Sequence, residues 1–436
     1  MERIVFAATG DSLINRRLAD YSPQVDRVAR LTERCDVVFT NLETVIRRNE
    51  GFPAAQSGGT WTSSPPGVLA DLKTYCINLV SWATNHTLDY SYGGLAATQR
   101  YLEESGLVHA GAGANLAEAS LPKYLDTPAG RVALIAVTAS FHESWIAGEQ
   151  RSDMVGRPGI NPLRHETYYR IAPERLKELR ELAQVSGINA TRELMVRNGF
   201  ATPDKADLVR FGNHLFRAAT PGENEGAVTT PHQGDMQRIL KSIDEARRQA
   251  AYTVVSFHAH QFKDGRNEVA ADFVHDFAHA CIDQGAHAVI GHGPHIVRGI
   301  ELYRGRPIFY SLGNFIFQSD TVTNLPSDYY TKYGLGPEHT TADALDVRSD
   351  CDSRGYAVNP AIWRSILPLW RMEEGELKSL VIYPLALGFG LPRHARGWPA
   401  LTDDLKVLEE VMELSRPYGL EFEMESDRIV WQLPGE

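Results

Sequence analysis

The sequence predicts a layered α/β fold in which strands and helices alternate along most of the chain. Short apolar runs rich in β-branched residues alternate with stretches whose apolar residues recur at helical spacing. Polar residues able to bind a metal follow several of those runs directly. With 43% hydrophobic and 23% charged residues among 436, the composition is that of a globular protein with a sizeable core.

The elements follow from these two patterns. We expect strands at 4–9, 36–40, 77–83, 131–138, 252–257 and 286–290, and hairpins at 296–305 with 306–317 and within 364–387. We expect helices at 23–35, 65–76, 93–106, 172–184, 234–250, 269–285 and 401–417. Pro23 suits a first helical turn, and Gly106 suits a helix C-terminus.

Residues 142–235 interrupt this alternation. The segment is polar, contains "GRPGINPLR" at 156–164, and then carries a charged helix. We interpret it as an insertion or cap within a single domain of residues 1–436. Residues 360–436 would add a C-terminal β-hairpin and helix packed on the same domain. The length alone would also allow two or three domains of about 150 residues each.

Charge and targeting signals narrow the class of protein. The net charge of -11 and the lack of a basic, aromatic patch disfavour nucleic-acid binding. A strand begins almost at the N-terminus, and no window approaches the ~20 apolar residues of a membrane helix. Four cysteines lie far apart, which suits a reducing compartment. We therefore expect a cytoplasmic protein without membrane insertion, which leaves a homo-oligomer open.

Potential metal ligands follow five predicted strands. They are Asp11, Asn41 with Glu43, Asn85 with His86, His258 with His260, and His292 with His295. Ligands bind at the carboxyl ends of strands in open α/β sheets, and this mixture of donors suits Mn, Fe or Zn. Each signal alone is weak, because Gly-Asp is often a turn and a lone histidine is usually structural. Five together predict a metal site.

The segment "GHGPH" at 291–295 places two histidines three positions apart. The Gly-Pro between them fixes a turn, so both side chains can converge on one cluster. The alternative is a glycine-rich turn with exposed histidines.

These motifs resemble those of the CapA family (capsule or poly-γ-glutamate synthesis proteins) within the metallophosphoesterase superfamily. The similarity extends from residue 4 to about 420, and its strongest block is the segment 291–315. The matching segments are "GD" at 10–11, "NLE" at 41–43, "NHTLDY" at 85–90, "GRPGINPLR" at 156–164, His258, "GHGPHIVRGIELYRGRPIFYSLGNF" at 291–315 and "LSRPYG" at 414–419.

The resemblance implies a metallophosphoesterase-like four-layer αββα sandwich with one or two divalent ions at the strand ends. Asp11 would be a shared ligand, and one site would be completed by Asn85, His258 and His292. His295 and Glu43 would serve a second site. Two departures from the superfamily's motifs imply that the second site could be weak, differently ligated or empty. Asp11-Ser12-Leu13 stands where the superfamily has D-x-H, and Asn41 with Glu43 replaces an aspartate.

Further residues are candidates for roles in catalysis or substrate binding. His86 would be the general acid and Asp89 would orient it, although His86 could instead hydrogen-bond a metal-binding carboxylate. His260 is a catalytic candidate that could also lie on the far face of its strand. Arg157, Arg164 and Asn41 are candidates for binding an anionic substrate, with a surface ion pair as the alternative for both arginines. Asn314 could touch the site or cap a turn.

The predicted function is that of a metal-dependent hydrolase. A metal lowers the pKa of its bound water toward about 7, so a metal-bound hydroxide is present at neutral pH. It would attack a phosphoester or an amide (γ-glutamyl or imide-like) bond in a small or oligomeric anionic substrate. The alternative is a non-catalytic or accessory protein of poly-γ-glutamate or capsule synthesis.

Overall fold

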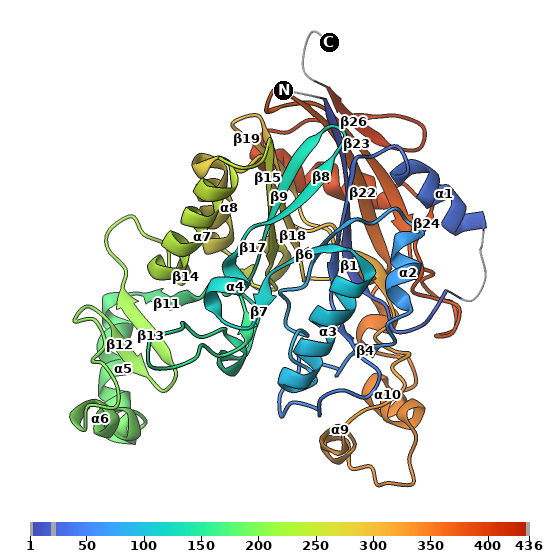
Figure 1. Ribbon diagram of the computed structural model, residues 1–436. Helices are drawn as coiled ribbons and strands as arrows, with labels where there is room; N and C mark the ends of the chain where they lie inside the picture. The colour runs from blue at the N-terminus through green and yellow to red at the C-terminus, as the bar shows by residue number, and fades with distance from the viewer. Residues whose placement is uncertain (1–2, 19–22, 433–436) are drawn as a thin grey trace.

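The computed structural model describes residues 3–18 and 23–432, so both ends of the predicted 1–436 domain lie outside the described residues. Two large β-sheets pack face to face, and helices cover the outer face of each (Figure 1). The predicted four-layer αββα sandwich is confirmed.

The larger sheet has the strand order β25-β26-β23-β22-β1-β2-β5-β6, with β21 beside β1 and β24 beside β23. Strands β1, β2, β5 and β6 run parallel, so their carboxyl ends share one edge. The strands are β1 (Ile4–Leu13), β2 (Val37–Leu42), β5 (Leu79–Ser81), β6 (Val108–Ala110), β21 (Asn314–Phe317), β22 (Arg364–Glu373), β23 (Glu376–Ala386), β24 (Ala400–Leu401), β25 (Glu423–Met424) and β26 (Ile429–Gln432).

The second sheet has the strand order β19-β20-β18-β15-β9-β8. Its strands β9, β15, β18 and β20 are parallel and end on the same side of the sandwich as β1 and β2 (Figure 1). The strands are β8 (Lys123–Thr127), β9 (Gly130–Thr138), β15 (Tyr252–His258), β18 (Ala288–His292), β19 (Ile300–Tyr303) and β20 (Arg306–Phe309).

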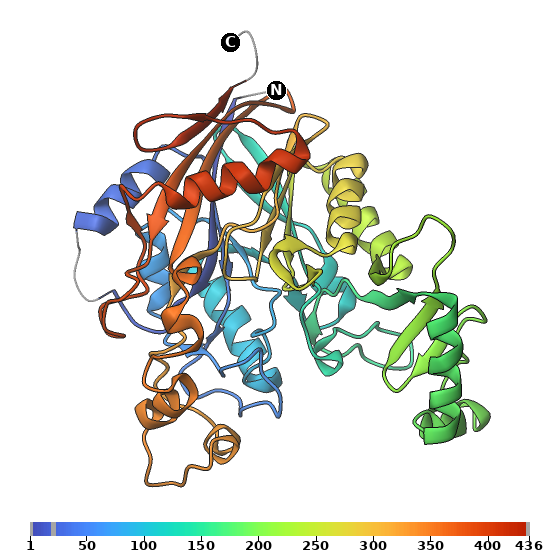
Figure 2. The same ribbon diagram turned by 180° about the vertical axis from the view of Figure 1, so that it is seen from behind.

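Alternating side chains build the layers. In β1, Phe6 faces the core between the sheets, where its ring stacks on Trp370 at 5.0 Å, whereas Ala7 faces the outer helices. The principal helices are α1 (Pro23–Thr32), α2 (Val68–Lys73), α3 (Ser91–Ser105), α7 (Gln233–Ala246), α8 (Asp272–Gln284) and α11 (Lys406–Ser415). Figure 2 shows α11, in red, lying across the back of the sandwich. Within the described ranges, no helix is long and apolar enough to cross a membrane.

Much of the predicted insertion forms a small unit at one side of the sandwich (Figure 2). Its four-stranded sheet has the order β12-β13-β11-β14, beside two helices with several exposed apolar residues. The helices and strands between residues 159 and 231 are β10 (Gly159–Ile160), which lies outside this sheet, β11 (His165–Ile171), α5 (Pro173–Ser186), α6 (Ala190–Arg197), β12 (Val209–Phe211), β13 (His214–Ala218) and β14 (Gly226–Pro231).

Two expected strand boundaries are wrong. The segment 306–317 divides into β20 and β21, and β21 crosses to the larger sheet beside β1. The first strand continues past residue 9 to Leu13, with a register shift between Ala8 and Asp11. Glycine at position 10 permits both the register shift in β1 and the approach of β21, because a Cβ there would lie 1.8 Å from the carbonyl oxygen of Gly313. Asp11 is therefore inside β1 rather than behind it.

The remaining elements are short. Helices α9 and α10 fall in a stretch for which the sequence pattern predicted nothing. These elements are β3 (Val45–Ile46), β4 (Ser63–Ser64), β7 (Ala112–Gly113), α4 (Leu116–Ser120), β16 (Phe262–Lys263), β17 (Arg266–Ala270), α9 (Ser327–Lys332), α10 (Thr341–Ser349), and the 3₁₀ helices Glu143–Trp145, Gly355–Val358, Pro360–Trp363 and Arg416–Tyr418.

Candidate metal centre

Side chains from both sheets meet where their parallel strands end. Asp11 lies opposite Asn41 in the register of β1 and β2, and His258 lies opposite His292 in the register of β15 and β18. These four side chains are buried, as is Glu43, which follows β2. The two sheets therefore bring their acidic and imidazole groups to one place.

The first group of possible ligands contains Asp11, His258 and His292. Asp11 Oδ1 lies 3.7 Å from Nδ1 of His292 and 4.0 Å from Nδ1 of His258. The two imidazole nitrogens are 3.0 Å apart. Three donor atoms at these separations can bind one cation between them.

The second group contains Asp11, Glu43 and His295. It uses the other oxygen of Asp11, since Oδ2 lies 3.7 Å from Nδ1 of His295. Nδ1 of His295 is also 3.8 Å from Oε2 of Glu43. Asp11 thus turns one oxygen toward each group, which is the geometry that a ligand shared by two ions requires.

A third group contains Glu43, His258 and His260. Nε2 of His258 lies 3.7 Å from Oε1 of Glu43 and 3.2 Å from Nε2 of His260. Asn85 places Oδ1 2.8 Å from the same Nε2. His258 therefore turns Nδ1 to the first group and Nε2 to the third. A neutral imidazole has one lone pair, so it can serve only one of the two at a time.

Unpaired oxygens show that the cluster fits a cation. Both carboxylate oxygens of Glu43 and Oδ1 of Asn41 are buried and have no hydrogen-bond partner among the described residues. Burying such acceptors without a partner costs free energy, which a divalent cation would offset. The oxygen and imidazole donors match Mn, Fe or Zn.

Burial also sets the protonation of these groups. Burial raises the pKa of Asp11 to about 7, although hydrogen bonds from Asn41 and the Gly293 N–H oppose the rise. Burial, together with the nearby charges of Asp11 and Asp89, holds the pKa of Glu43 well above its usual value. A cation binding here would therefore have to displace protons.

The histidines are held neutral. Burial lowers the pKa of His292 to about 3 and that of His295 to about 4, and it holds the pKa of His258 well below its usual value. Nε2 of His292 lies 2.6 Å from Ser256 Oγ. When that nitrogen carries the hydrogen, Nδ1 keeps its lone pair toward Asp11.

The turn 291–295 directs both of its histidines into the cluster. Gly293 has φ +115°, and a Cβ there would lie 3.2 Å from both His258 Cε1 and His260 Cδ2. His295 itself has φ +62°, an uncommon conformation for a residue other than glycine. Asn314 donates Nδ2 to the carbonyl oxygens of His295 and Ile362, so its Oδ1 accepts the Nδ1–H of His295 at 2.9 Å, and that nitrogen could bind a cation only by giving up this hydrogen bond. Asn314 therefore touches the site, one of its two expected positions.

His86 and Asp89 form a pair beside the cluster. Nδ1 of His86 lies 2.7 Å from Oδ2 of Asp89, which also accepts the Thr62 N–H at 2.8 Å. Asp89 is fully buried, and burial raises its pKa. His260, which is partly exposed, is fixed by a backbone hydrogen bond to Ser140 Oγ at 2.9 Å.

Comparisons with known proteins decide the family. Residues 5–319 match the family model for the bacterial capsule synthesis protein PGA_cap. The chain belongs to the PGA_cap family. This confirms the resemblance to capsule and poly-γ-glutamate synthesis proteins.

Several bacterial proteins are similar to this chain. Two uncharacterized proteins of Sinorhizobium fredii, y4sH and y4uA, are each 34% identical over 445 residues, which cover 98% of this chain and 93% of theirs. A probable polyglutamine synthesis accessory protein of Mycobacterium tuberculosis is 27% identical over 285 residues, or 64% of this chain and 55% of that protein. The long alignments to the first two cover nearly the whole PGA_cap chain.

The arginines expected to bind substrate make other contacts. Arg164 Nε pairs with Asp235 Oδ2 at 2.8 Å, and Arg157 Nε donates to the carbonyl oxygen of Ile146 at 2.9 Å. In the described chain, no hydrogen bond or ion pair joins either arginine to the metal cluster. Asn41 does lie in the cluster, where Nδ2 donates to Asp11 Oδ1 at 2.7 Å. Substrate binding by these three residues stays a prediction.

Sequence reasoning missed several residues that support the centre. Ser256 contacts His292, Thr62 donates to Asp89, and the Tyr356 ring lies 5.7 Å from that of His295. None of them belongs to a recognisable motif. Ser256 alone carried a signal, since it stands two residues before His258 in the same strand and so points to the same face.

Proposed function

We propose that this member of the PGA_cap family is a metal-dependent hydrolase acting on a phosphoester or amide bond of an anionic substrate. The observation that supports it best is the buried cluster, in which Glu43 has both oxygens unpaired and Asp11 turns one oxygen toward each of two ligand groups. A buried arrangement of this kind is costly without a cation.

The ligands divide as follows. Asp11 is shared between two positions, with His292 and His258 at the first and with Glu43 and His295 at the second. Asn85 adds its amide oxygen beside His258. A divalent cation bound there lowers the pKa of a water molecule and polarises the bond under attack.

The His86–Asp89 pair supplies a proton to the leaving group. Asp89 accepts the Nδ1–H of His86, which fixes the ring and leaves Nε2 to carry a proton for the leaving group. The hydrogen bonds from Thr62 and Gly58 keep Asp89 in place. His260, next to His258, either completes the third ligand group or contacts substrate.

A second candidate function is that of an accessory protein. A relative from Mycobacterium tuberculosis is named as a probable polyglutamine synthesis accessory protein. In that case the cluster would hold its cation to stabilise the fold or a partner surface, without turnover.

One experiment separates the two functions. The purified protein is loaded with Mn, Fe or Zn and assayed on bis-aryl phosphates, phosphate monoesters and γ-glutamyl amides. The hydrolase predicts metal-dependent turnover of at least one class, abolished in His86→Gln while the metal is retained. Bound metal with no turnover of any class would contradict the hydrolase and favour the accessory function.

A further inference from the structure

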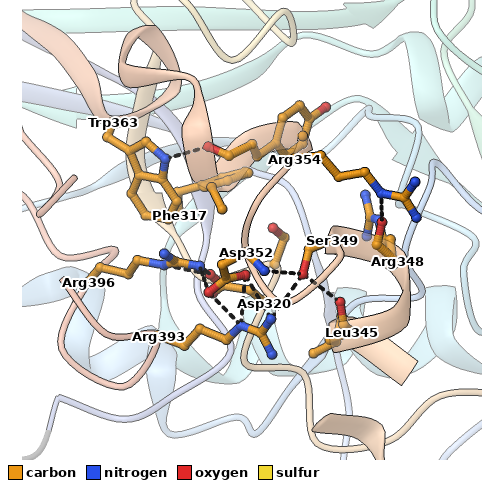
Figure 3. Close-up of a pocket in the computed structure, with 14 residues that line it drawn as sticks. Phe317, Asp320, Leu345, Arg348, Ser349, Asp352, Arg354, Trp363, Arg393 and Arg396 are labelled. Atoms are coloured by element: carbon orange, nitrogen blue, oxygen red, sulfur yellow. Dashed lines mark hydrogen bonds and ion pairs between the residues drawn. The ribbon is translucent and has the colours of Figure 1, made fainter. Parts of the chain in front are cut away.

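A cavity of about 280 Å³ lies beside the metal cluster and is lined by charged residues (Figure 3). Four arginines and two aspartates contribute to its wall, namely Arg348, Arg354, Arg393, Arg396, Asp320 and Asp352. The chain as a whole has a net charge of -11, so this excess of positive charge is local. We call this cavity the arginine pocket.

Two aromatic side chains separate the arginine pocket from the metal cluster. Phe317 and Tyr356 line the pocket, and both rings also contact the ring of His295, at 5.2 and 5.7 Å between centroids. The pocket is therefore one aromatic layer away from the second ligand group. A group bound in it would lie across Phe317 and Tyr356 from His295, beside the metal cluster rather than in it.

The aspartates of the pocket are already paired. Arg393 Nη2 lies 2.7 Å from Asp352 Oδ1, and Arg396 Nε lies 2.7 Å from Asp320 Oδ2. Figure 3 shows both guanidinium groups converging on these carboxylates. Arg396 is also held over the Trp363 ring at 4.7 Å. These pairs fix two arginines and offset most of the charge of both aspartates, although Asp320 Oδ1 has no partner among the described residues and Asp346 places a third carboxylate 2.8 Å from Arg393 Nη2.

The other two arginines have no such partner. Within the described residues, no carboxylate lies within 4.0 Å of Arg348 or Arg354. Arg354 donates to the backbone carbonyls of Arg348 and Val347, both at 3.1 Å. Arg348 contacts Thr60 Oγ1, in the loop whose Thr62 N–H binds Asp89. Two arginines without a carboxylate partner thus line the pocket, and one of them, Arg348, reaches the loop that supports the His86–Asp89 pair.

We propose that the arginine pocket binds an oxyanion of the substrate, a carboxylate or a phosphate, adjacent to the bond held at the metal cluster. Guanidinium groups pair with both kinds of oxyanion through charge-assisted hydrogen bonds. The proposal depends on the proposed function for the position of the reacting bond. It narrows the substrate to a molecule with a second anionic group beside that bond, such as an oligomer with repeated charges.

Calorimetric titration tests this without requiring turnover. The probes are a γ-glutamate pentamer and inorganic phosphate, added to the full chain with Mn²⁺ and after chelation. Arg348→Gln with Arg354→Gln should weaken binding of the preferred probe by about tenfold or more, the loss expected when charge-assisted bonds are removed. Arg175→Gln, which alters an exposed ion pair with Glu225 on the insertion, is the matched control and should bind normally.

The outcomes are distinct. Preference for the pentamer identifies carboxylates, and preference for phosphate identifies a phosphorylated substrate. Equal binding by the wild type and the double variant, or no binding of either probe, would overturn the proposal that the arginine pocket binds an oxyanion. Arginine-dependent binding without turnover would support anion binding by the arginine pocket and contradict only the proposed hydrolase function. If the double variant does not fold, as judged by its melting curve, Arg354→Gln alone, at an exposed position, should still weaken binding severalfold.

Discussion

Asp11 and Glu43 bring two carboxyl groups into a fully buried place beside the imidazoles of His258, His292 and His295. The pKa of Asp11 lies at about 7 and that of Glu43 well above its usual value, so the metal-free cluster retains protons at neutral pH. Burial lowers the pKa values of His258 and His292, so both imidazoles are neutral at that pH. A cation that binds here must therefore compete mainly with the protons on the carboxyl groups of Asp11 and Glu43.

This predicts how metal affinity depends on pH. A carboxyl group with a raised pKa must give up its proton to bind a cation, so affinity should rise as the pH increases between about 6 and 8. Titration calorimetry in two buffers of different ionisation enthalpy measures the protons released per cation. An affinity that is flat across this range, with no proton release, would contradict the protonation we assign to Asp11 and Glu43.

A substitution of His86 separates proton transfer from metal binding. His86→Gln removes the proton carrier, whereas the ligand groups at Asp11, Glu43 and the other histidines remain. We expect kcat to fall by about 10²–10⁴-fold, the usual contribution of a general acid, with the metal content unchanged. Steady-state kinetics and elemental analysis of the same sample check this. Parallel loss of metal and activity would make His86 a structural residue of the centre.

At the scale of elements, the turn 291–295 depends on Gly293. Gly293→Ala would place a methyl group against His258 and His260 at a positive φ, so both strain and displacement of ligands are expected. Gly305→Ala is the matched control, because Gly305 also has a positive φ (+72°) but no atom near its Cβ position. Both variants should lose stability in thermal unfolding, but only Gly293→Ala should lose metal affinity. Equal metal affinity in the two would contradict the close packing at the turn.

The join between the insertion and α7 depends on Asp235. This buried carboxylate pairs with Arg164 and Arg238, and although burial works to raise its pKa, their hydrogen bonds hold it at about 2. Asp235→Asn should lower the free energy of unfolding by about 2 kcal/mol, less than for a fully buried pair because Arg164 is half exposed.

The pH dependence of that loss has a definite sign. A carboxyl group whose pKa is lowered on folding stabilises the protein at pH values above its usual pKa of 3.8. This contribution is lost as the pH falls toward the pKa of about 2 that the group has in the folded protein. The difference between the wild type and Asp235→Asn should therefore be complete at neutral pH and shrink in acid. Denaturant unfolding at several pH values measures it, with Asp126→Asn, at an exposed ion pair, as a control expected to show little change. A constant difference would contradict the ion pair.

At the scale of the whole molecule, much of the sandwich was predictable because its buried strands are short apolar runs and its helices are amphipathic. The candidate ligands were predictable for the same reason, since each follows or ends such a run. The crossing of β21 between sheets was not, because it depends on the close approach of Gly10 to Gly313. The arginine pocket was also missed. Its residues come from α10 and loops without periodicity, and only tertiary packing brings them together.

The metal cluster joins distant parts of the chain. The hydrogen bond from the Gly293 N–H to Asp11 Oδ2, 3.0 Å long, spans 282 residues, and no local pattern could specify it. It forms because both sheets end their parallel strands on the same side of the sandwich. The centre is thus a property of the assembled fold, and removal of its cation should affect the whole PGA_cap chain rather than one loop.

Elemental analysis of the purified protein, beside Asp11→Ala and His258→Ala, tests the central claim most directly. We predict at least one equivalent of Mn, Fe or Zn in the wild type and its loss in both variants, with folding checked by circular dichroism. Asp126→Ala, at an exposed ion pair, should retain the metal of the wild type. A wild-type protein that binds none of these metals, or folded variants that keep their full content, would contradict a metal centre at this cluster.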